Sequence, residues 1–271
     1  MPRNIFIGDV HGCLDEFQEL IKIVDPKPED TLVQVGDLIH KGPDSAGVVD
    51  FWNQYNRSQK VLIFGNHEEK HVRWLRTEAK RLATGAENKM SYVEEYPSTG
   101  ITSERELILR NSYLAKTVGN TLAVHAGIPA ALTEPIPEIT HDEWLALPTR
   151  QRISLGQILR VRFLARAGKT RTNSKGQVVE VSEGKMLALG QHDPMDPYWA
   201  ETYDGRYGTV AFGHNPFMLS RPAIFKHAYG IDLGCVHGGH LCALIENNGL
   251  YSYKTVRAKR VYKERPAWTY E

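Results

Sequence analysis

The chain has 271 residues, of which 41% are hydrophobic and 24% charged, so it is long and apolar enough to bury a full core. Its formal net charge of +1 excludes a strongly basic coat for nucleic acid, and three cysteines are too few for a disulfide framework or a cysteine-rich zinc site. No apolar segment approaches the roughly 18 residues of a membrane span, and the first residues do not read as a signal peptide. We therefore expect a cytoplasmic protein with no membrane partner and no stable nucleic-acid partner.

The first third of the chain alternates short apolar runs with helical patterns. The strand-like runs are 4–10, 31–38 and 60–67, and apolar residues recur at helical spacing over 14–24, 48–55 and 72–82. Three strand–loop–helix units in succession predict an α/β sheet whose strands are joined by right-handed helical crossovers.

The rest of the chain is less regular and richer in strand-like stretches. Residues 84–102 are polar with Gly and Pro, 103–116 read as a helix, and 120–127 return to a strand. Further β-like stretches are 209–214, 223–234, 241–246 and 250–256. No linker rich in Gly or Ser divides the chain, so residues 1–271 are predicted to form a single domain of the α/β class.

Five strand-like runs end in a glycine beside a side chain that can bind a metal. The side chains are Asp9, Asp37, Asn66, His125 and His214, and His11 stands two residues after the first of them. Each one alone could be a helix cap or an ordinary polar group, but five coincidences favour a shared site. The carboxyl ends of strands in an open α/β sheet meet at one edge, and glycine allows the sharp turns and close approach needed there.

The donor set indicates the kind of ion. Mixed nitrogen and oxygen ligands suit Mn, Fe or Zn, whereas calcium and magnesium sites use oxygen alone. Six donors exceed what one tetrahedral ion needs. Two ions that share a carboxylate explain the number, and Asp37, the central aspartate, is the natural bridge.

Five segments resemble the calcineurin-like metallophosphoesterases in their order along the chain. They are GDVHG, GDLIHKGP, GNHE, HAG and FGH, and the branch they are similar to contains the Ser/Thr protein phosphatases and the symmetrical diadenosine tetraphosphate hydrolases. The resemblance implies a four-layer fold with a central β-sandwich flanked by helices. It places Asp9, His11 and Asp37 on one divalent ion and Asp37, Asn66, His125 and His214 on the other. Mn is expected first, with Fe, Zn, Co or Ni as alternatives.

The same resemblance implies a mechanism without a protein nucleophile. Two ions lower the pKa of a bridging water, and the resulting hydroxide attacks phosphorus in line. His67 is expected near the leaving oxygen, where it would donate a proton; a phosphate-binding or structural role is the alternative. In the protein phosphatases a second aspartate orients this histidine. His40 stands at that position here, so the orienting carboxylate is missing.

Three cations are predicted to bind substrate phosphate. Lys41 replaces an arginine of the relatives, Arg162 lies in an RVRF segment similar to RMRF of the dinucleotide hydrolases, and Arg206 precedes a strand that ends at the site. Residues 144–179 carry eight Lys or Arg and no acid. Both a solvated basic face and a phosphate-rich substrate explain this run.

The segment GIDLGCVHGGHLCAL at 230–244 resembles another motif of the family. Asp232 is expected to support a metal-bound histidine or water through a hydrogen bond. His237 and His240, which flank two glycines, are expected in a surface turn. No motif includes His71, His141, His192 or His227.

The leading hypothesis is a phosphatase of phosphate monoesters, broad in substrate or acting on phosphoproteins. The alternative is a symmetrical dinucleoside polyphosphate hydrolase, favoured by RVRF, the basic segment and the missing aspartate, or a phosphatase of nucleotide or RNA ends. A metal-binding scaffold without catalysis is a different class, and the complete ligand set argues against it.

Overall fold

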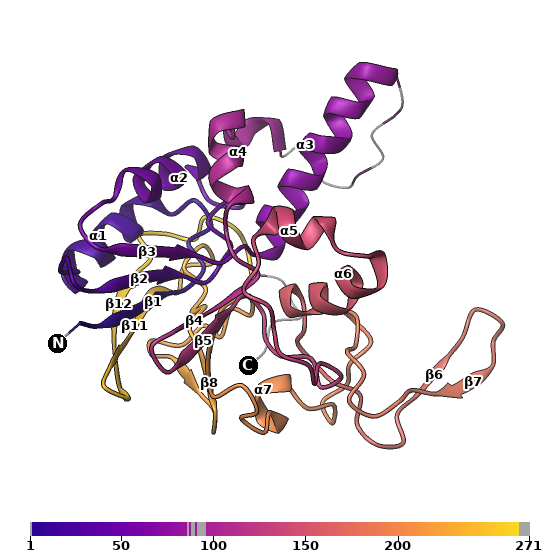
Figure 1. Cartoon of the computed structure of the whole chain (residues 1–271). Helices are drawn as coiled ribbons and strands as arrows, with labels where there is room; N and C mark the ends of the chain where they lie inside the picture. The colour runs from indigo at the N-terminus through magenta and orange to yellow at the C-terminus, as the bar shows by residue number, and fades with distance from the viewer. Residues whose placement is uncertain (1, 86, 88–89, 91–95, 266–271) are drawn as a thin grey trace.

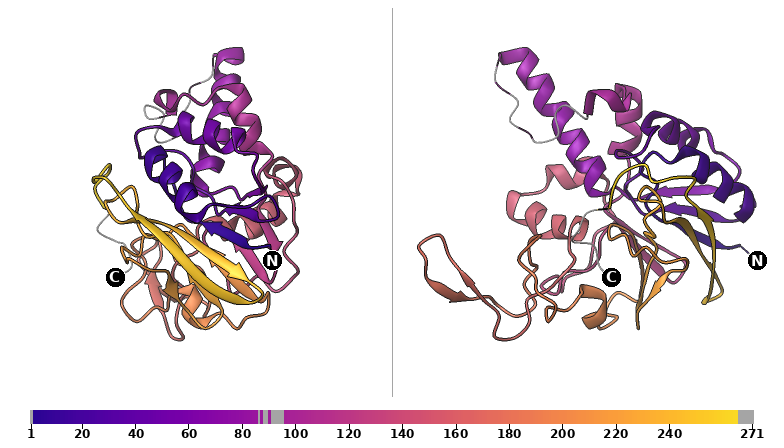
Figure 2. Two further views of the ribbon diagram at one scale, coloured as in Figure 1. Left: turned by 90° about the vertical axis from the view of Figure 1, so that its left-hand side faces the viewer. Right: turned by 180° about the vertical axis from the view of Figure 1, so that it is seen from behind.

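Two five-stranded sheets pack face to face in the computed structural model, which describes residues 2–85, 87, 90 and 96–265 (Figures 1 and 2). The first sheet has the order β12-β11-β1-β2-β3 and the second the order β4-β5-β8-β10-β9. The first contains β1 (Asn4–Ile7), β2 (Thr31–Gln34), β3 (Gln59–Leu62), β11 (His240–Asn247) and β12 (Leu250–Arg257). The second contains β4 (Ala115–Val118), β5 (Thr121–Val124), β8 (Thr209–Phe212), β9 (Ala223–Ile224) and β10 (Ala228–Gly230).

The two-residue period of the strands divides the hydrophobic core into two layers. Phe6 of β1 points toward the second sheet and packs in one cluster with Phe212 of β8. Its neighbours Ile5 and Ile7 point the other way, into a second cluster with Phe17 of a covering helix. Since β1, β2 and β3 run parallel, their carboxyl ends reach the same edge of the sheet.

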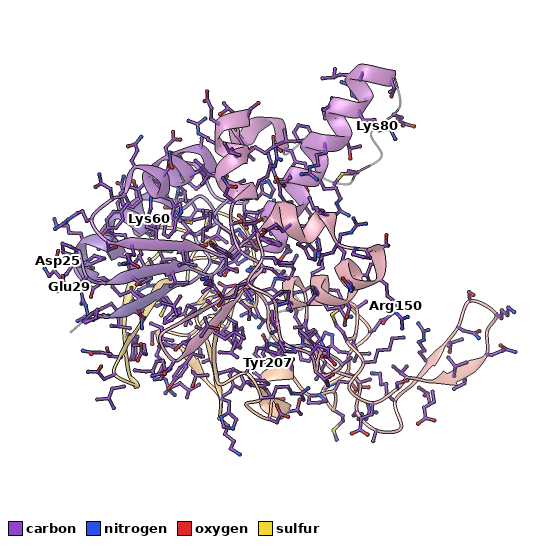
Figure 3. The ribbon with its side chains drawn as sticks, viewed as in Figure 1. Asp25, Glu29, Lys60, Lys80, Arg150 and Tyr207 are labelled. Carbon is purple, nitrogen blue, oxygen red and sulfur yellow. The ribbon has the colours of Figure 1, made fainter. Side chains whose placement is uncertain are left out.

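Helices lie over the first sheet and along the side of the molecule, and the last one along the chain packs against the second sheet (Figure 1). They are α1 (Leu14–Val24), α2 (Ser45–Gln54), α3 (Asn66–Thr84), α4 (Ser103–Arg110), α5 (His141–Ala146), α6 (Thr149–Leu155) and α7 (Trp199–Thr202), with 3-10 turns η1 (Tyr96–Thr99) and η2 (Gly156–Leu159). The far end of α3, marked by Lys80 in Figure 3, extends away from the sheets. The prediction of an α/β fold with a β-sandwich flanked by helices is confirmed.

Two further features complete the course of the chain. A small hairpin of β6 (Thr170–Thr172) and β7 (Val178–Glu180) projects from the body in Figure 1. The polar segment predicted at 84–102 lies in part outside the described residues. Across the part of the chain that the structure describes, no helix is long and apolar enough to cross a membrane.

The predicted helix over 103–116 is too long. Helix α4 ends at Arg110, and β4 begins at Ala115. Between them, the backbone N–H of Tyr113 donates to the carbonyl of Leu62, and that of Leu114 donates to the carbonyl of Ile139. These long-range backbone bonds replace helical ones, which is a tertiary preference that local propensity does not contain.

Candidate metal centre

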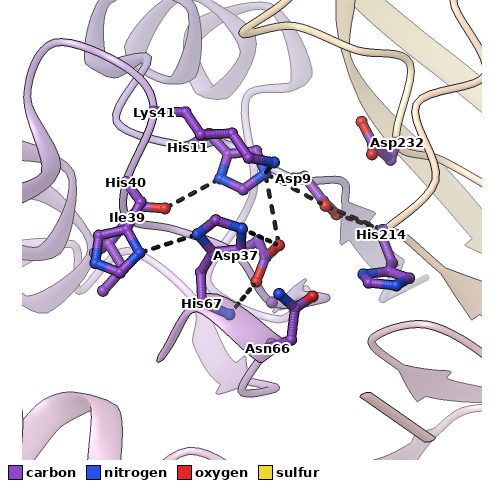
Figure 4. Close-up of polar contacts among 12 residues, drawn as sticks. Asp9, His11, Asp37, Ile39, His40, Lys41, Asn66, His67, His214 and Asp232 are labelled. Atoms are coloured by element: carbon purple, nitrogen blue, oxygen red, sulfur yellow. Dashed lines mark hydrogen bonds and ion pairs between the residues drawn. The ribbon is translucent and has the colours of Figure 1, made fainter. Parts of the chain in front are cut away.

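The six side chains predicted as metal ligands lie together at the edge where the strands of both sheets end. Five of them are labelled in Figure 4. They are Asp9 and His11 after β1, Asp37 after β2, Asn66 after β3, His125 after β5 and His214 after β8, and all six are buried. Parallel strands therefore bring to one place residues that are as many as 205 positions apart, such as Asp9 and the backbone N–H of His214, which donates to its carboxylate at 3.0 Å.

Asp37 lies between two groups of ligand atoms. Its Oδ2 atom is 3.5 Å from Nε2 of His11 and 3.4 Å from Nε2 of His125. On the second side, Nε2 of His125 is 3.0 Å from Oδ1 of Asn66 and 3.1 Å from Nδ1 of His214. One carboxylate within reach of both groups is the arrangement that a bridging ligand requires.

Backbone carbonyls orient two of the histidine rings. Nδ1 of His11 lies 3.0 Å from the carbonyl of Ile39, and Nδ1 of His125 lies 3.0 Å from the carbonyl of Val35. A carbonyl accepts only, so each Nδ1 carries the proton and each Nε2 keeps its lone pair for a metal.

A buried glutamate holds the loop that carries Asp37. The carboxylate of Glu68, in the first turn of α3, accepts the backbone N–H groups of Asp37 at 2.8 Å, Leu38 at 2.9 Å and Gly65 at 2.7 Å. Asp37 itself has φ 56°, in the left-handed region that non-glycine residues rarely adopt. The hydrogen bonds of Glu68 hold this turn in place and fix Asp37 relative to the start of α3.

The glycines beside the ligands are required by close contacts. A Cβ atom on Gly65 would lie 2.1 Å from Oδ1 of Asp37, and one on Gly213 would lie 1.9 Å from Oδ1 of Asp9. No side chain fits at such distances. The sequence-based reason for these glycines, close approach of the backbone at the strand ends, is confirmed.

Burial sets the charge of the cluster. It lowers the pKa of His11, His67 and His214 well below the ordinary value of 6.5, so these rings are neutral imidazoles, the form that binds metal. Burial, with the charges of Asp232 and Asp37, raises the pKa of Asp9.

Burial raises the pKa of Asp37 too. The neighbouring rings of His125, His67 and His11 outweigh burial and hold this pKa well below the usual range. Asp37 is thus the carboxylate that stays ionised most readily. Nε2 of His214 is buried and has no hydrogen-bond partner among the described residues. The free nitrogen of His214, the neutral rings and the ionised carboxylate fit divalent cations. Two groups that share Asp37 could each hold one: His11, Asp37 and His67 on one side, and Asp37, His125 and His214 on the other. The first group contains His67 where the sequence predicts Asp9, which lies 3.9 Å from Nε2 of His11.

A cavity of about 560 Å³ opens beside the cluster. Asp37, Asn66, His67 and His214 form one part of its wall. The cations on its wall are Lys41, Lys70, Arg160, Arg162 and Lys263, and the apolar part consists of Phe163, Met186, Leu187, Ala188, Leu189 and Pro216. This volume is in the range that holds small-molecule ligands.

Lys41 and Arg162, two of the three cations predicted to bind substrate phosphate, line this cavity, and phosphate binding stays a prediction. Nζ of Lys41 lies 2.8 Å from Nε2 of His11, so its ammonium stands inside the ligand cluster rather than at its rim. The guanidinium of Arg162 donates to the carbonyl of His214 at 3.4 Å. Burial lowers the pKa of Arg162 to about 10, which leaves the group charged at neutral pH.

The structure does not bring Arg206 to the site. Its guanidinium pairs with Asp204 at 2.9 Å and donates to the carbonyls of Ala130 and Leu132, and the residue does not line the cavity. The turn before β8 places it at the end of the strand opposite the cluster, since His214 follows the other end. Asp232 is buried beside Asp9, yet within the described residues its side chain accepts from the N–H of Gly234 and reaches none of the six ligands by a hydrogen bond.

Two expectations about histidines were wrong. His237 is buried and lines the cavity, with Nδ1 2.8 Å from the carbonyl of Lys263, and His240 begins β11. Neither lies in a surface turn, because the adjoining segment at 258–263 folds over them. Two histidines that no motif contains also lie near the cavity: His192 lines it, and His71 is hydrogen-bonded to His40, which lines it. The spacing of His67 and His71, four residues apart on one helix, was the signal that could have found His71.

The basic run at 144–179 does not form one face. Arg160 pairs with Glu69, and Arg166 and Lys169 pair with Asp193 and Asp196, which follow later in the chain. Arg150 is exposed on α6 (Figure 3). Of the eight basic residues of this run, only Arg160 and Arg162 line the cavity, as far as the described residues show.

Residues 3–166 match the model of the calcineurin-like phosphoesterases, which is more than half of the chain. The protein belongs to this family and is a metal-dependent phosphoesterase. A symmetrical bis(5′-nucleosyl)-tetraphosphatase from Edwardsiella ictaluri is 25% identical over 95% of this chain and 98% of the relative. An asymmetrical bis(5′-nucleosyl)-tetraphosphatase from Bacillus velezensis is 26% identical over 87% of this chain and 85% of the relative.

A solved structure of a candidate diadenosine tetraphosphatase superimposes over 93% of each chain, with a TM-score of 0.62 and 24% identity. At this identity the likeness concerns the fold alone. The names of the relatives agree with the alternative hypothesis from the sequence, and they give no specific support to the leading one, a monoester phosphatase.

Proposed function

We propose that the protein hydrolyses the phosphoanhydride chain of dinucleoside polyphosphates, with diadenosine tetraphosphate as the model substrate. Two divalent ions, Mn²⁺ first among them, would be held by Asp9, His11 and Asp37 on one side and by Asp37, Asn66, His125 and His214 on the other. The named activities of the relatives support this substrate class. The substrate would be met in the cytoplasm.

The observation that carries the proposal is the composition of the cavity beside the ligand cluster. Beside the ligand cluster it has several cations, which suit a polyphosphate, and an apolar wall, which does not. In that wall the ring of Phe163 stacks on that of His192, with centroids 3.9 Å apart and planes 4° from parallel. A flat aromatic surface beside a phosphate site matches a nucleotide, in which a planar base is joined to a chain of phosphates. A simple phosphate monoester would use only the charged part.

The residues of the cavity have distinct tasks in this proposal. Bound ions would lower the pKa of a water between them and offset the charge of the phosphate oxygens. Lys41 and Arg162 bind phosphate oxygens that the ions do not reach, and Arg162 can hold two of them at once. His67 faces the cavity beside Asp37, with Nε2 4.0 Å from Oδ2, and is placed to donate to the leaving oxygen.

The test is a comparison of diadenosine tetraphosphate with p-nitrophenyl phosphate, each with Mn²⁺. We expect kcat/KM for the dinucleotide to exceed that for the monoester by about 100-fold or more, because only the dinucleotide fills the apolar wall. Chromatography of the products distinguishes symmetrical cleavage, which gives ADP alone, from asymmetrical cleavage, which gives AMP and ATP. Faster turnover of the monoester would contradict the proposal and return the monoester phosphatase to first place.

A further inference from the structure

Three histidine rings form a hydrogen-bonded row that ends at the cavity. Nδ1 of His67 lies 2.9 Å from Nδ1 of His40, and Nε2 of His40 lies 2.8 Å from Nδ1 of His71. Figure 4 shows the first of these contacts, with the ring of His67 between His40 and Asp37. His67 and His71 are one turn apart on α3, and His40 comes from the loop after β2. A residue of that loop thus bridges two rings on one face of a helix.

The middle ring has little freedom. His40 is only 2% exposed and stacks on Tyr96, with centroids 4.8 Å apart and planes 16° from parallel. Its backbone has φ 71°, in the left-handed region, and its N–H donates to Oγ of Ser45 at 2.9 Å. A strained backbone held by such contacts is characteristic of functional loops. Both ring nitrogens of His40 therefore point at fixed partners.

Neutral imidazoles make the row directional. Burial lowers the pKa of His40 to about 3 and that of His71 to about 4, so at neutral pH each ring has one N–H donor and one acceptor nitrogen. Asp37 selects the direction of the row. Its carboxylate only accepts and lies 4.0 Å from Nε2 of His67, which favours the proton of His67 on Nε2 and leaves Nδ1 of His67 as an acceptor. Nδ1 of His40 is then the donor to His67, and Nε2 of His40 accepts from Nδ1 of His71.

We propose that His40, supported by His71, is a positioning residue that fixes the ring of His67 and keeps its proton on Nε2, facing the cavity. A carboxylate at position 40 would impose the opposite arrangement, because it only accepts and would hold the proton on Nδ1. The imidazole at this position thus replaces the missing carboxylate with a partner that can donate. The inference rests on the proposed role of His67 at the leaving oxygen. The Nε2–H of the neutral ring donates a hydrogen bond to the charge that develops on that oxygen, so the ring keeps its proton and no imidazolate has to form.

Two variants test the row. His40→Phe keeps a ring to stack on Tyr96 but removes both hydrogen bonds, and His71→Phe removes only the far partner. His141→Phe is the matched control, since His141 is equally buried but packs against Phe64 and Trp144 outside the row. If His40→Phe fails to fold, His71→Phe carries the same test.

The first readout is spectroscopic and independent of substrate. In enzyme loaded with Zn²⁺, a diamagnetic ion that this donor set accepts, the ¹⁵N shifts of the ring nitrogens report which one carries the proton. We expect His67 protonated on Nε2 in the unaltered protein, a mixture of both forms in the two row variants, and no change in His141→Phe. A proton on Nδ1 in the unaltered protein, or the same shifts in all variants, would overturn the proposal.

The second readout separates positioning from a general loss of structure. The loss of kcat/KM in the row variants should be about tenfold larger for an alkyl phosphate than for p-nitrophenyl phosphate. The alkoxide is a poor leaving group that needs a donor, whereas the nitrophenolate leaves without one. Equal losses on both substrates would count against the proposal. Neither readout requires turnover of a dinucleotide, so a failure of the substrate proposal is distinguished from a failure of this one.

Discussion

Asp37 is the residue at which the two groups of ligands meet, and its geometry makes a specific prediction about metal content. With Oδ2 within 3.5 Å of a histidine on each side, the Asp37→Asn variant loses a charged ligand shared by both sites. We expect affinity for Mn²⁺ to fall by about 100-fold and activity by at least as much, since outer partners of metal sites alone account for 10- to 100-fold. Elemental analysis after gel filtration measures the metal. Asp50→Asn, remote from the site and paired with Arg105, is the control. Full metal content in the variant would contradict the bridging role.

Removal of Lys41 is predicted to affect metal affinity and catalytic efficiency in opposite directions. Its ammonium, 2.8 Å from Nε2 of His11, adds positive charge beside the ligands. Lys41→Ala should therefore bind divalent metal as tightly as the unaltered protein or more tightly, because a repelling charge is removed. Catalytic efficiency should fall about tenfold or more, on the order of 1.4 kcal/mol of transition-state stabilisation, because a phosphate ligand is lost. Lys41→Arg should retain activity.

Calorimetric titration with Mn²⁺ and steady-state kinetics on the same samples measure the two effects. If Lys41→Ala binds metal more weakly and loses activity in proportion, its role is to hold the ligands. Unchanged kinetics would leave Arg162 as the principal phosphate ligand.

At the scale of elements, the first turn of α3 and the loop after β2 depend on one carboxylate. Both carboxylate oxygens of Glu68 accept backbone N–H groups from the two loops. In a glutamine one of these oxygens becomes an NH₂ group, which cannot accept and leaves its N–H partners unsatisfied. Unsatisfied buried donors cost about 1–3 kcal/mol each, so Glu68→Gln should lose on the order of 3 kcal/mol of stability and weaken metal binding. Urea unfolding in EDTA measures the first effect, and Glu104→Gln, exposed on α4, is the control. A midpoint equal to that of the control would show that Glu68 does not hold these loops.

The elements that the sequence predicted well are those whose signal is local. Short apolar runs that end in glycine and a polar side chain located β1, β2 and the ligands after them. Both the burial of the strand and the need for space at its end depend on neighbouring residues. The helix over 103–116 failed because the backbone of Tyr113 and Leu114 bonds to distant segments.

The parts of the site that were missed depend on contacts between distant segments. The row of His40, His67 and His71 needs a loop and a helix side by side, and the cavity wall needs Phe163 beside His192. Arg206 was misplaced although the sequence contained the signal. It precedes the strand that His214 follows, so it lies at the end opposite the cluster. Ligands that belong to one short motif can be predicted from the sequence, whereas contacts between distant segments cannot.

On the scale of the whole molecule, burying neutral histidines makes stability depend on acid. Burial lowers the pKa of both His71 and His141 to about 4, against 6.5 in the unfolded chain. Above pH 6.5 neither state binds the proton. As the pH falls below 6.5 the unfolded chain takes up protons first, so the free energy of unfolding decreases until about pH 4, where the folded protein is protonated too.

The His141→Phe variant isolates one such contribution. Both ring nitrogens of His141 are buried without a hydrogen bond among the described residues, and the nearest carboxylate oxygen, of Asp142, lies 3.8 Å from Nδ1. The ring packs on Phe64 with centroids 4.8 Å apart, so phenylalanine fits the site. Between the two pKa values the free energy of unfolding changes by about 1.4 kcal/mol per pH unit. The unaltered protein should therefore lose on the order of 2 kcal/mol between pH 7 and pH 4.5 through His141. We expect the variant to be at least as stable as the unaltered protein at pH 7 and to lose about 2 kcal/mol less on acidification. Urea unfolding at both pH values in EDTA measures the difference, and equal losses in the two proteins would show that His141 does not remain neutral in the folded state.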